Sequence, residues 1–333
     1  MRHFTFIEPG ADWYDPLHAF CTEWLSAGDT IVNRTSGSTG TPKDMPVHKE
    51  RMRISARRTN TRFGNTQDTV MLLCLPAAYI AGRMMIVRAL EANCTLLCTR
   101  PALNPMLRLT GDMPVDFAAL TPAQVAEICR DPKSFELFRR IRTVILGGAP
   151  LSPALRELLQ GEAGEEQQIY ETYGMTETLS HIAVKNIRES VFRPVSAHIS
   201  LYTDADDCLR IDDPELLDEP LQTRDRVKLY EDGSFTWLGR MDFVINSGGI
   251  KIHPEELEKH LSAHPQLSGV NYYIGRKTDP QFGEVPVLYI ESEPFDFRIE
   301  EMQGLIARNI FPREILFRPA FSYTETGKIK RES

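Results

Sequence analysis

The chain has 333 residues, of which 42% are hydrophobic and 25% are charged, and its formal net charge is −8. This composition is typical of a globular protein with a large buried core and more than one domain. The negative charge argues against general binding to nucleic acid or to an anionic membrane surface, because both need a positive protein surface.

The start of the chain, MRHFTFIEPGADWYDP, lacks the apolar segment and cleavage site of a signal peptide, and no apolar run is long enough to predict a membrane span. The cysteines lie mostly in apolar stretches such as CTLLCT, which indicates buried free thiols. We therefore expect a cytoplasmic protein. His260 and His264 lack an HExxH pattern and are expected to be surface histidines, not zinc ligands.

Short apolar segments alternate with helical patterns through the first half of the chain. We expect strands at 69–76, 94–99, 115–120 and 143–149, and helices at 77–93, 122–130 and 152–160. Thr121 before Pro122, and Ser152 before Pro153, are typical helix starts. The alternation predicts an α/β domain whose largely parallel sheet is covered by helices.

The pattern changes near residue 199. Short strands are expected at 199–203, 208–211, 226–230 and 234–239, with Asp232-Gly233 at a hairpin tip. A smaller α+β unit follows, with helices at 254 onward and 298–310 and strands at 270–275 and 285–291. We therefore expect a large N-terminal domain, 1–241, with a small antiparallel region, and a smaller, mobile C-terminal domain, 242–333.

The stretch NRTSGSTGTPKDM, residues 33–45, is rich in glycine and hydroxyl side chains and precedes the basic helical segment 48–62. Backbone N–H groups of such a loop can hold phosphate oxygens, with Lys43 adding a charge. Thr41 and Pro42 separate Gly40 from Lys43, so this is not a Walker A loop. Alone, the stretch predicts a phosphate loop about as well as a flexible connection. The basic segment itself predicts a solvated helix face, or, as the weaker alternative, a local anion contact.

Further motifs follow this loop in a fixed order: TSGSTGTPK, GGAP, YGMTET, TRD, GRMDFVINSGGIKIHPEELE and TGKIKR. Together they resemble the adenylate-forming superfamily of acyl-CoA synthetases, luciferases and peptide-synthetase adenylation domains. Within it, LP…AG, LTPAQ, TRD, WLGR and INSGGIKI are most similar to o-succinylbenzoate–CoA ligases of menaquinone biosynthesis. The resemblance runs from Thr35 to Arg331.

This resemblance implies an acid–thiol ligase that uses ATP, Mg²⁺ and coenzyme A. A carboxylate attacks the α-phosphorus of ATP, and the thiol of coenzyme A then attacks the acyl-adenylate. Such chemistry depends on positioning and charge neutralisation. The implied catalytic residues are Lys328, between the substrate carboxylate and the α-phosphate, Thr176 on the phosphate, and Glu177 on the metal. Lys330 and Arg331 are expected to be solvated.

The resemblance also assigns binding roles. Asp225 and Arg240 would hold the ribose, Asp242 would be the hinge between the domains, and Gly248 and Gly249 would line the pantetheine path. The remaining cofactor-binding residues implied are Thr35, Ser36, Gly37, Ser38, Thr39, Gly40, Lys43, Gly147, Gly148, Ala149, Glu171, Thr172, Tyr173, Gly174, Met175 and Lys251.

The acid pocket departs from the family pattern. Many relatives have a histidine where LPAAYIAG places Tyr79, and Arg83 follows one turn later. Succinylbenzoate carries a second carboxylate that needs a polar partner, and Arg83 either supplies it or is a surface arginine. Thr121 and Gln124 are further candidates for the pocket wall.

Two features leave alternatives open. The phosphate loop comes early and the segment between Glu177 and Asp225 is short, so an exposed sheet must be covered differently, for which a homodimer is one hypothesis. The acid could be another aryl or short acyl carboxylate, and a truncated, non-catalytic nucleotide-binding protein is a further alternative. A carrier-protein loading domain is less favoured, because no carrier segment accompanies it.

Overall fold

The computed structural model describes residues 4–7, 13–34, 44–111, 113–164, 166–298, 302, 305–307, 310–322 and 329–331. The chain forms two compact units. The first comprises Met1–Leu151, Leu159–Ser200 and Asp212–Leu221, and the second comprises Ser152–Leu158, Leu201–Ile211 and Gln222–Ser333. The expected boundary between Met241 and Asp242 falls inside the second unit and stays a prediction.

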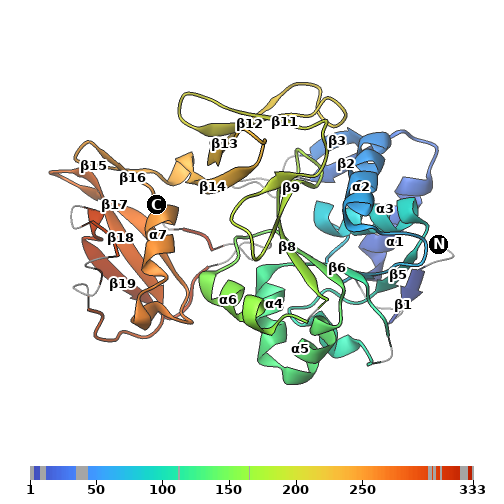
Figure 1. Cartoon of the computed structure of the whole chain (residues 1–333), viewed down its shortest axis with the longest axis horizontal. Helices are drawn as coiled ribbons and strands as arrows, with labels where there is room; N and C mark the ends of the chain where they lie inside the picture. The colour runs from blue at the N-terminus through green and yellow to red at the C-terminus, as the bar shows by residue number, and fades with distance from the viewer. Residues whose placement is uncertain are drawn as a thin grey trace. The chain divides into compact units, whose positions relative to one another are not determined.

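An eight-stranded sheet is the framework of the first unit (Figure 1). Its order is β1-β5-β4-β6-β7-β8-β9-β10; neighbours from β1 to β8 run parallel, and β9 and β10 are antiparallel additions. The strands are β1 (Phe4–Phe6), β4 (Val70–Leu73), β5 (Thr95–Cys98), β6 (Phe117–Leu120), β7 (Thr143–Leu146), β8 (Gln168–Gly174), β9 (His181–Asn186) and β10 (Arg193–Pro194). The expected α/β class with a mostly parallel sheet is therefore confirmed.

Four helices of the chain's first half coincide with segments that the sequence predicted as helical, 48–62, 77–93, 122–130 and 152–160, and two others were not predicted. These helices are α1 (Tyr14–Leu25), α2 (Lys49–Phe63), α3 (Ile80–Ala92), α4 (Pro122–Arg130), α5 (Pro132–Arg139) and α6 (Pro153–Glu162). Thr121 caps α4 in a reciprocal capping box with Gln124, as expected. Helices α2 and α3 lie side by side (Figure 1). Burial of large side chains such as Phe20 and Met85 stabilises the core that α1, α2 and α3 form with the sheet.

The glycine- and threonine-rich stretch connects two paired strands. Strand β2 (Thr30–Arg34) pairs antiparallel with β3 (Asp44–His48), and α2 begins directly after β3. The sequence predicted only the basic helical segment 48–62 directly after this stretch. Strand β3 was missed because Pro46 lies at its centre and weakens the strand pattern.

The second unit contains two further sheets. Strands β11 (Ser200–Thr203), β12 (Cys208–Asp212), β13 (Leu221–Leu229) and β14 (Phe235–Arg240) form the expected small sheet, with β13 and β14 antiparallel. Gly233 has a φ of 75° at the tip of their hairpin, which glycine adopts without strain.

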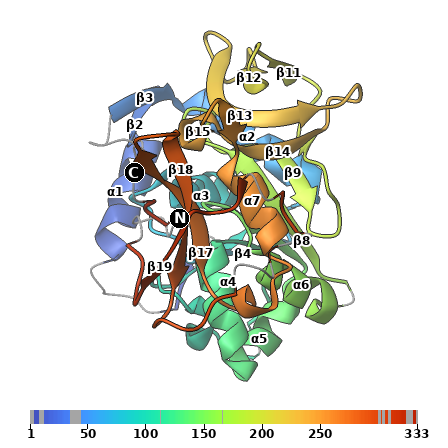
Figure 2. The ribbon, with the colours of Figure 1, turned by 90° about the vertical axis from the view of Figure 1, so that its left-hand side faces the viewer.

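The C-terminal sheet of this unit has five strands, in the order β16-β15-β18-β17 with β19 beside β18. Helix α7 (Pro254–Leu261) lies against β17 (Figure 2). The strands are β15 (Ile245–Ser247), β16 (Ile250–Ile252), β17 (Tyr272–Asp279), β18 (Gly283–Glu291) and β19 (Glu314–Arg318). The helix expected at 298–310 lies mostly outside the described residues.

Three simpler expectations can be compared directly with the structure. The cysteines are unpaired, and all except Cys129 are buried. In the described part of the chain, no helix has the length and hydropathy to cross a membrane. His264 is not a surface histidine: it is fully buried, and its ring stacks on that of Phe297 with the ring centroids 4.7 Å apart. Helix α7 ends at Leu261, so His264 does not share an exposed helix face with His260.

Candidate active site

The carboxyl ends of the parallel strands collect most of the site residues expected in the first unit. Tyr79 precedes α3 after β4, Thr121 follows β6, and Gly147 follows β7. Because neighbouring parallel strands end at the same sheet edge, these residues come from one edge. That edge is where open α/β sheets bind ligands.

The structure brings two of the expected nucleotide-binding segments into contact. Strand β7 pairs with β8, and the hydroxyl of Thr172 donates to the carbonyl of Leu146 at 2.9 Å. A Cβ on Gly147 would lie 2.7 Å from Thr172 Oγ1, so the contact requires glycine. Gly148 adds a φ of 90° in the following turn. The GGA and ETYG segments are thus in direct contact, through the Thr172 side chain and the backbone at Leu146 and Gly147.

The YGMTE segment forms a tight turn between β8 and β9. A Cβ on Gly174 would lie 2.3 Å from the carbonyl oxygen of Ser180, which explains the glycine. Thr178 closes the turn: its hydroxyl accepts from the N–H of Met175 at 3.0 Å and donates to the carbonyl of Ser180 at 2.8 Å. Glu177 is exposed in this turn.

Mg²⁺ binds proteins through one or two carboxylates and completes its octahedron with water and substrate phosphates. The exposed carboxylate of Glu177 fits that donor set. In the part of the chain that the structure describes, no group of three or more His, Cys, Asp or Glu side chains could hold a metal ion by itself. A cation here would therefore depend on a phosphate-bearing ligand.

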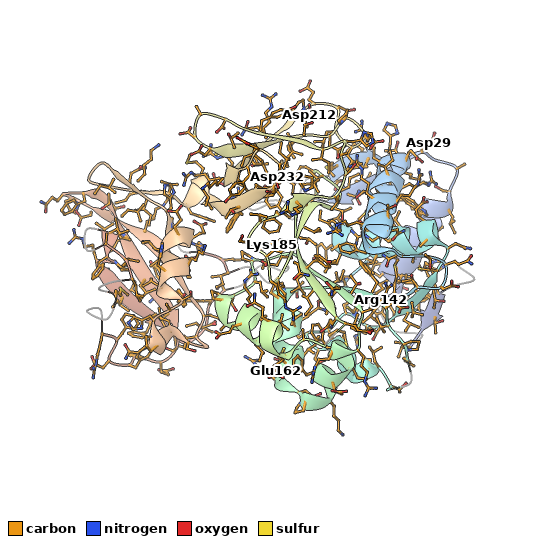
Figure 3. The ribbon with its side chains drawn as sticks, viewed as in Figure 1. Asp29, Arg142, Glu162, Lys185, Asp212 and Asp232 are labelled. Atoms are coloured by element: carbon orange, nitrogen blue, oxygen red, sulfur yellow. The ribbon has the colours of Figure 1, made fainter. Side chains whose placement is uncertain are left out.

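Glu171 is half-buried beside this turn, and its carboxylate lies 3.2 Å from Lys185 Nζ on β9. Figure 3 labels Lys185, whose ammonium also lies 4.6 Å from the centre of the Phe192 ring. Tyr173 faces the same ring at 6.0 Å. Glu171 and Tyr173 are therefore held by β9 and the segment that follows it.

The residues expected to line the acid pocket have separate local roles. Gly82 lets α3 start close to the preceding loop, because a Cβ there would lie 2.3 Å from the carbonyl oxygen of Pro76. Tyr79 is half-buried at the N-cap of this helix. Gln124 is buried and donates to the carbonyl of Ala102 at 2.9 Å. These contacts fix the start of α3 and the side chain of Gln124 at this edge of the sheet.

Arg83 lies next to Tyr79 on α3 and contacts the hairpin that leads into the expected phosphate loop. Its guanidinium donates to Asn33 Oδ1 at 2.9 Å and to the carbonyls of Val32 and Ala77. It also lies 5.2 Å above the ring of Phe20. These contacts connect α3 with the end of β2.

Sequence reasoning missed Arg88, which lies further along α3 and is 2% exposed. Its Nη2 donates to the hydroxyl of Ser180, its Nε has no hydrogen-bond partner, and no described carboxylate pairs with it. Burial lowers its pKa to about 9. His181 lies in the same cluster: its Nδ1 is 3.3 Å from Ser180 Oγ and its Nε2 is 3.3 Å from Thr59 Oγ1. A buried cation without an anion is costly and marks a functional candidate.

In the second unit, Asp225 and Arg240 are directly opposite each other on β13 and β14. Asp225 is buried, and its Oδ1 lies 3.9 Å from the guanidinium of Arg240. The same oxygen accepts the indole N–H of Trp237 at 3.0 Å. The structure thus brings the two expected ribose residues together and adds Trp237.

Asp242 follows this pair and lies between two arginines. Its Oδ1 accepts from Arg224 Nε at 3.0 Å, and its Oδ2 accepts from Arg240. Hydrogen bonds from Arg240 and Arg224 outweigh burial and lower the pKa of Asp242. Its role as a hinge stays a prediction.

Gly248 and Gly249 form the two-residue turn between β15 and β16, with φ values of 56° and 85°. A Cβ on Gly248 would lie 2.9 Å from the ring of Phe282. The exposed Lys251 lies 3.8 Å from Asp206. The positive φ values therefore explain both glycines without reference to the expected pantetheine path.

Thr35 to Lys43 and Lys328 lie outside the described residues. One expectation for the tail was wrong: Arg331 is not solvated. It is half-buried and its guanidinium contacts Glu258 Oε1 at 2.7 Å and Oε2 at 2.9 Å. The guanidinium also lies over the rings of Phe243 and Tyr273. These rings and the half-buried carboxylate of Glu258 partly cover a charge that was expected to be solvated.

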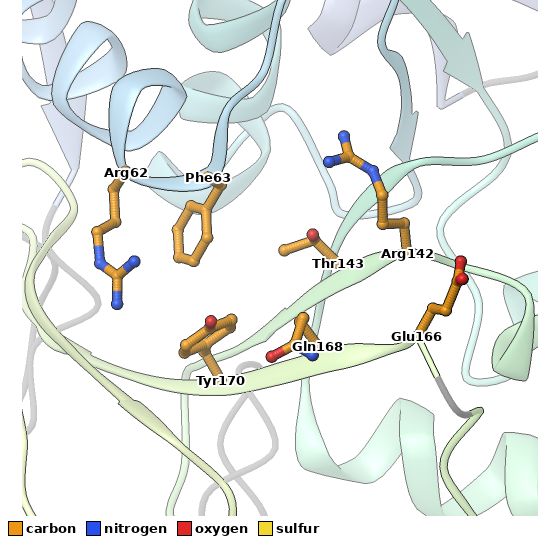
Figure 4. Close-up of a pocket in the computed structure, with 7 residues that line it drawn as sticks. All are labelled: Arg62, Phe63, Arg142, Thr143, Glu166, Gln168 and Tyr170. Atoms are coloured by element: carbon orange, nitrogen blue, oxygen red, sulfur yellow. The ribbon is translucent and has the colours of Figure 1, made fainter.

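A pocket of about 370 Å³ lies at the opposite, amino-terminal end of β7 and β8. Figure 4 shows Arg62 and Phe63, at the end of α2, above Tyr170 of β8. The guanidinium of Arg62 lies 5.5 Å from the centre of the Tyr170 ring. None of the expected site residues lines this pocket.

The pattern of the family described as AMP-binding enzyme matches residues 19–204. The chain is 25% identical to a 2-succinylbenzoate–CoA ligase of Lactococcus lactis, over 91% of this chain and 70% of the relative. A relative of the same name from Enterococcus faecalis is 26% identical over 89% of this chain and 67% of its own length.

Solved structures show the same fold. An acyl-CoA synthetase (AMP-forming)/AMP-acid ligase II-like protein from Dyadobacter fermentans is 31% identical, with a TM-score of 0.66, over 97% of this chain and 93% of that chain. An o-succinylbenzoate coenzyme A synthetase from Bacillus subtilis, in complex with ATP and magnesium ion, is 21% identical with a TM-score of 0.73, over 90% of this chain and 68% of that chain.

Proposed function

Because the chain belongs to the AMP-binding enzyme family, we propose that it is an AMP-forming acid–CoA ligase that converts o-succinylbenzoate to its CoA thioester. The observation that carries this proposal is the carboxyl edge of the parallel sheet. There Gly147 contacts Thr172, and the turn after Gly174 presents Glu177. Hydrogen-bond donors and an exposed carboxylate at one edge support the proposal, because adenylation requires donors for phosphate and a ligand for Mg²⁺.

The residues act by binding and by neutralising charge. Backbone N–H groups of residues 172–176 and the hydroxyl of Thr176 orient the α-phosphate, while Asp225 and Arg240 bind the ribose. Glu177 would hold Mg²⁺, which neutralises phosphate charge when bound. The acid carboxylate then attacks phosphorus and pyrophosphate leaves. In the second step the CoA thiol, passing Gly248 and Gly249, displaces AMP. We assign Lys328 to the first step.

The choice of acid rests on its second carboxylate. Arg83, the candidate from sequence, donates to two backbone carbonyls and to Asn33. Arg88 is buried near the YGMTE turn, contacts Ser180, and has no described carboxylate partner. An acid that brings an anion to Arg88 would offset the cost of burying that charge. This favours a dicarboxylate over a simple aryl or short acyl acid.

ATP–pyrophosphate exchange over a panel of acids, followed by addition of CoA, tests the proposal. We expect exchange with o-succinylbenzoate and little with benzoate, short-chain or fatty acids. Exchange only with a monocarboxylate would show that the proposed substrate is wrong and that the proposed adenylation chemistry is right. If no acid supports exchange, the protein is not a ligase and the non-catalytic alternative is favoured.

The role of Arg88 has its own test. Arg88→Gln should lower kcat/KM for o-succinylbenzoate by roughly 100-fold, since a hydrogen-bonded charge pair is lost. Activity on a monocarboxylate analogue should change much less. Arg83→Gln serves as the matched comparison on the same helix. An equal loss on both acids would make Arg88 a structural residue.

A homodimer and a cytoplasmic location remain predictions of the same proposal. Sedimentation at micromolar concentration tests the first, and a monomer would contradict it. Fractionation of the source cells tests the second.

A further inference from the structure

We propose that Trp237 is a positioning residue for the ribose-binding carboxylate of Asp225, and that a bulge in β14 is what makes this possible. The inference rests on the proposed function, because Asp225 must bind the ribose of ATP for its orientation to matter. It adds a residue that the sequence motifs do not identify.

The contact between Trp237 and Asp225 is short and partly buried. The indole Nε1–H of Trp237 donates to Asp225 Oδ1 at 3.0 Å, and Asp225 is 7% exposed. An N–H that donates to a buried carboxylate forms a charge-assisted bond, which is stronger than a neutral one. A carboxylate has about four lone-pair sites, so this bond leaves it able to accept from ribose hydroxyls.

The backbone of Asp225 is fixed as well. Its N–H donates to Thr223 Oγ1 at 3.1 Å, and that hydroxyl donates to the carbonyl of Leu209 on the neighbouring strand at 2.7 Å. The main chain and the carboxylate of Asp225 are therefore held by different partners. Trp237 contacts the part that would meet the ribose.

The strand register explains how two donors reach one carboxylate. Asp225 is opposite Arg240 and Arg226 is opposite Gly239, but Val227 is opposite Trp237, so β14 has one extra residue at this point. Side chains alternate between the faces of a regular strand, and residues 237 and 240 would then point to opposite faces. The extra residue puts both on the face of Asp225.

Gly239 permits the bulge. Its φ is 129°, and a Cβ at this position would lie 2.6 Å from Glu255 Oε2 on α7. Another residue would be strained by both its backbone and its contact with α7. The sequence WLGR therefore encodes a geometry in which Trp237 and Arg240 approach Asp225 Oδ1 together.

The test compares ATP with 2′,3′-dideoxy-ATP in the acid-dependent exchange reaction. Trp237→Phe keeps the ring but removes the N–H donor. We expect the KM for ATP to rise roughly tenfold, as the loss of one such hydrogen bond implies, while kcat changes less than about twofold. With dideoxy-ATP, which has no hydroxyls for Asp225, the variant and the unmodified protein should differ less than about twofold.

A second readout is spectroscopic. Trp237 is one of three tryptophans. Titration with AMP should change the indole fluorescence of the unmodified protein, and Trp237→Phe should abolish most of this change. Trp24→Phe is the matched control, because Trp24 is buried in the core of the first unit and stacks on Phe20. It should keep both the fluorescence response and the KM for ATP.

The outcomes separate this inference from the proposed function. Absence of exchange by the unmodified protein with every acid contradicts the function itself. An active protein in which Trp237→Phe changes the KM values for ATP and dideoxy-ATP equally contradicts positioning through the ribose. Unchanged KM values for both nucleotides would contradict any role of Trp237.

Discussion

Arg331 contacts both carboxylate oxygens of Glu258, at 2.7 and 2.9 Å, and connects the end of the described chain to helix α7. Glu258 Oε1 also accepts the backbone N–H of Ile274 on β17 at 2.8 Å. Arg331, three residues after Lys328, is therefore linked through Glu258 to both α7 and β17 of the second unit. Removal of the Arg331 guanidinium would leave the half-buried carboxylate of Glu258 without its cation.

At pH 8, where most of Glu258 is ionised, Arg331→Met should destabilise the second unit by roughly 1–2 kcal/mol, because removing one partner of this half-buried ion pair leaves the other charge poorly compensated. Chemical denaturation of the full chain measures this. Lys330→Met is the control, since Lys330 is exposed, and its effect should stay within about 0.5 kcal/mol. Equal effects of the two variants would show that the ion pair contributes nothing.

Lowering the pH from 7.5 to 5.5 should move the unfolding of the two units in opposite directions. Burial keeps the pKa of His181 well below its usual value, so the first unit loses stability as the pH falls below about 6.5. Burial raises the pKa of Glu258 to about 7 despite Arg331, so the second unit gains stability as the pH falls from about 7 toward 4.5.

Differential scanning calorimetry of the full chain tests this pH dependence. His181→Gln should reduce the acid sensitivity of the first transition, and Glu258→Gln should reduce the acid stabilisation of the second. Parallel shifts of both transitions, unaltered by either variant, would contradict the assignment to these two groups.

The thiols should resist alkylation in the folded protein. Burial raises the pKa of Cys21, Cys94 and Cys129 to about 11 and that of Cys74 to about 12. Less than about 1% of each would be thiolate at pH 8, and the thiolate is the nucleophile. Mass spectrometry should find little reaction with iodoacetamide before denaturation and six modified cysteines after it. Rapid modification of Cys74 in the native protein would contradict its burial.

Lys328→Ala should lower adenylation by about 100-fold or more and leave the conversion of supplied acyl-AMP to thioester largely intact. A cation about 4 Å from two mutually repelling anions contributes roughly 4 kcal/mol per pair at an effective dielectric constant near 20. Lys330→Ala is the control. Exchange and thioester formation, measured separately, decide the assignment, and normal exchange by the Lys328 variant would refute it.

Local signals in the sequence were sufficient for much of the fold. Thr121 and Pro122 predicted the start of α4 because a cap is a contact between near neighbours. The apolar runs predicted β4 to β7 because strands buried on both faces contain few polar residues. Gly147 and Gly174 were identified from motifs, and each is required because a Cβ at its position would clash with a neighbouring segment.

Other features depend on contacts between distant segments. Arg88 and Arg83 differ little in sequence context, yet Arg88 is buried against Ser180 and Arg83 contacts the end of β2. Arg331 and His264 are charged or polar residues that tertiary packing covers. Trp237 contacts Asp225 only because of a bulge. None of these follows from hydrophobic periodicity, which reports one element at a time.

The extra residue in β14 has a consequence for how this site can change during evolution. A substitution alters one side chain, but insertion of a single residue between Arg226 and Val227 would give Leu238 a partner on β13, restore regular alternation and turn Trp237 and Arg240 to opposite faces of the sheet. Composition and charge would hardly differ. The arrangement of Trp237 and Arg240 around Asp225 therefore depends on strand length as much as on residue identity, and insertions here are expected to be more harmful than most replacements.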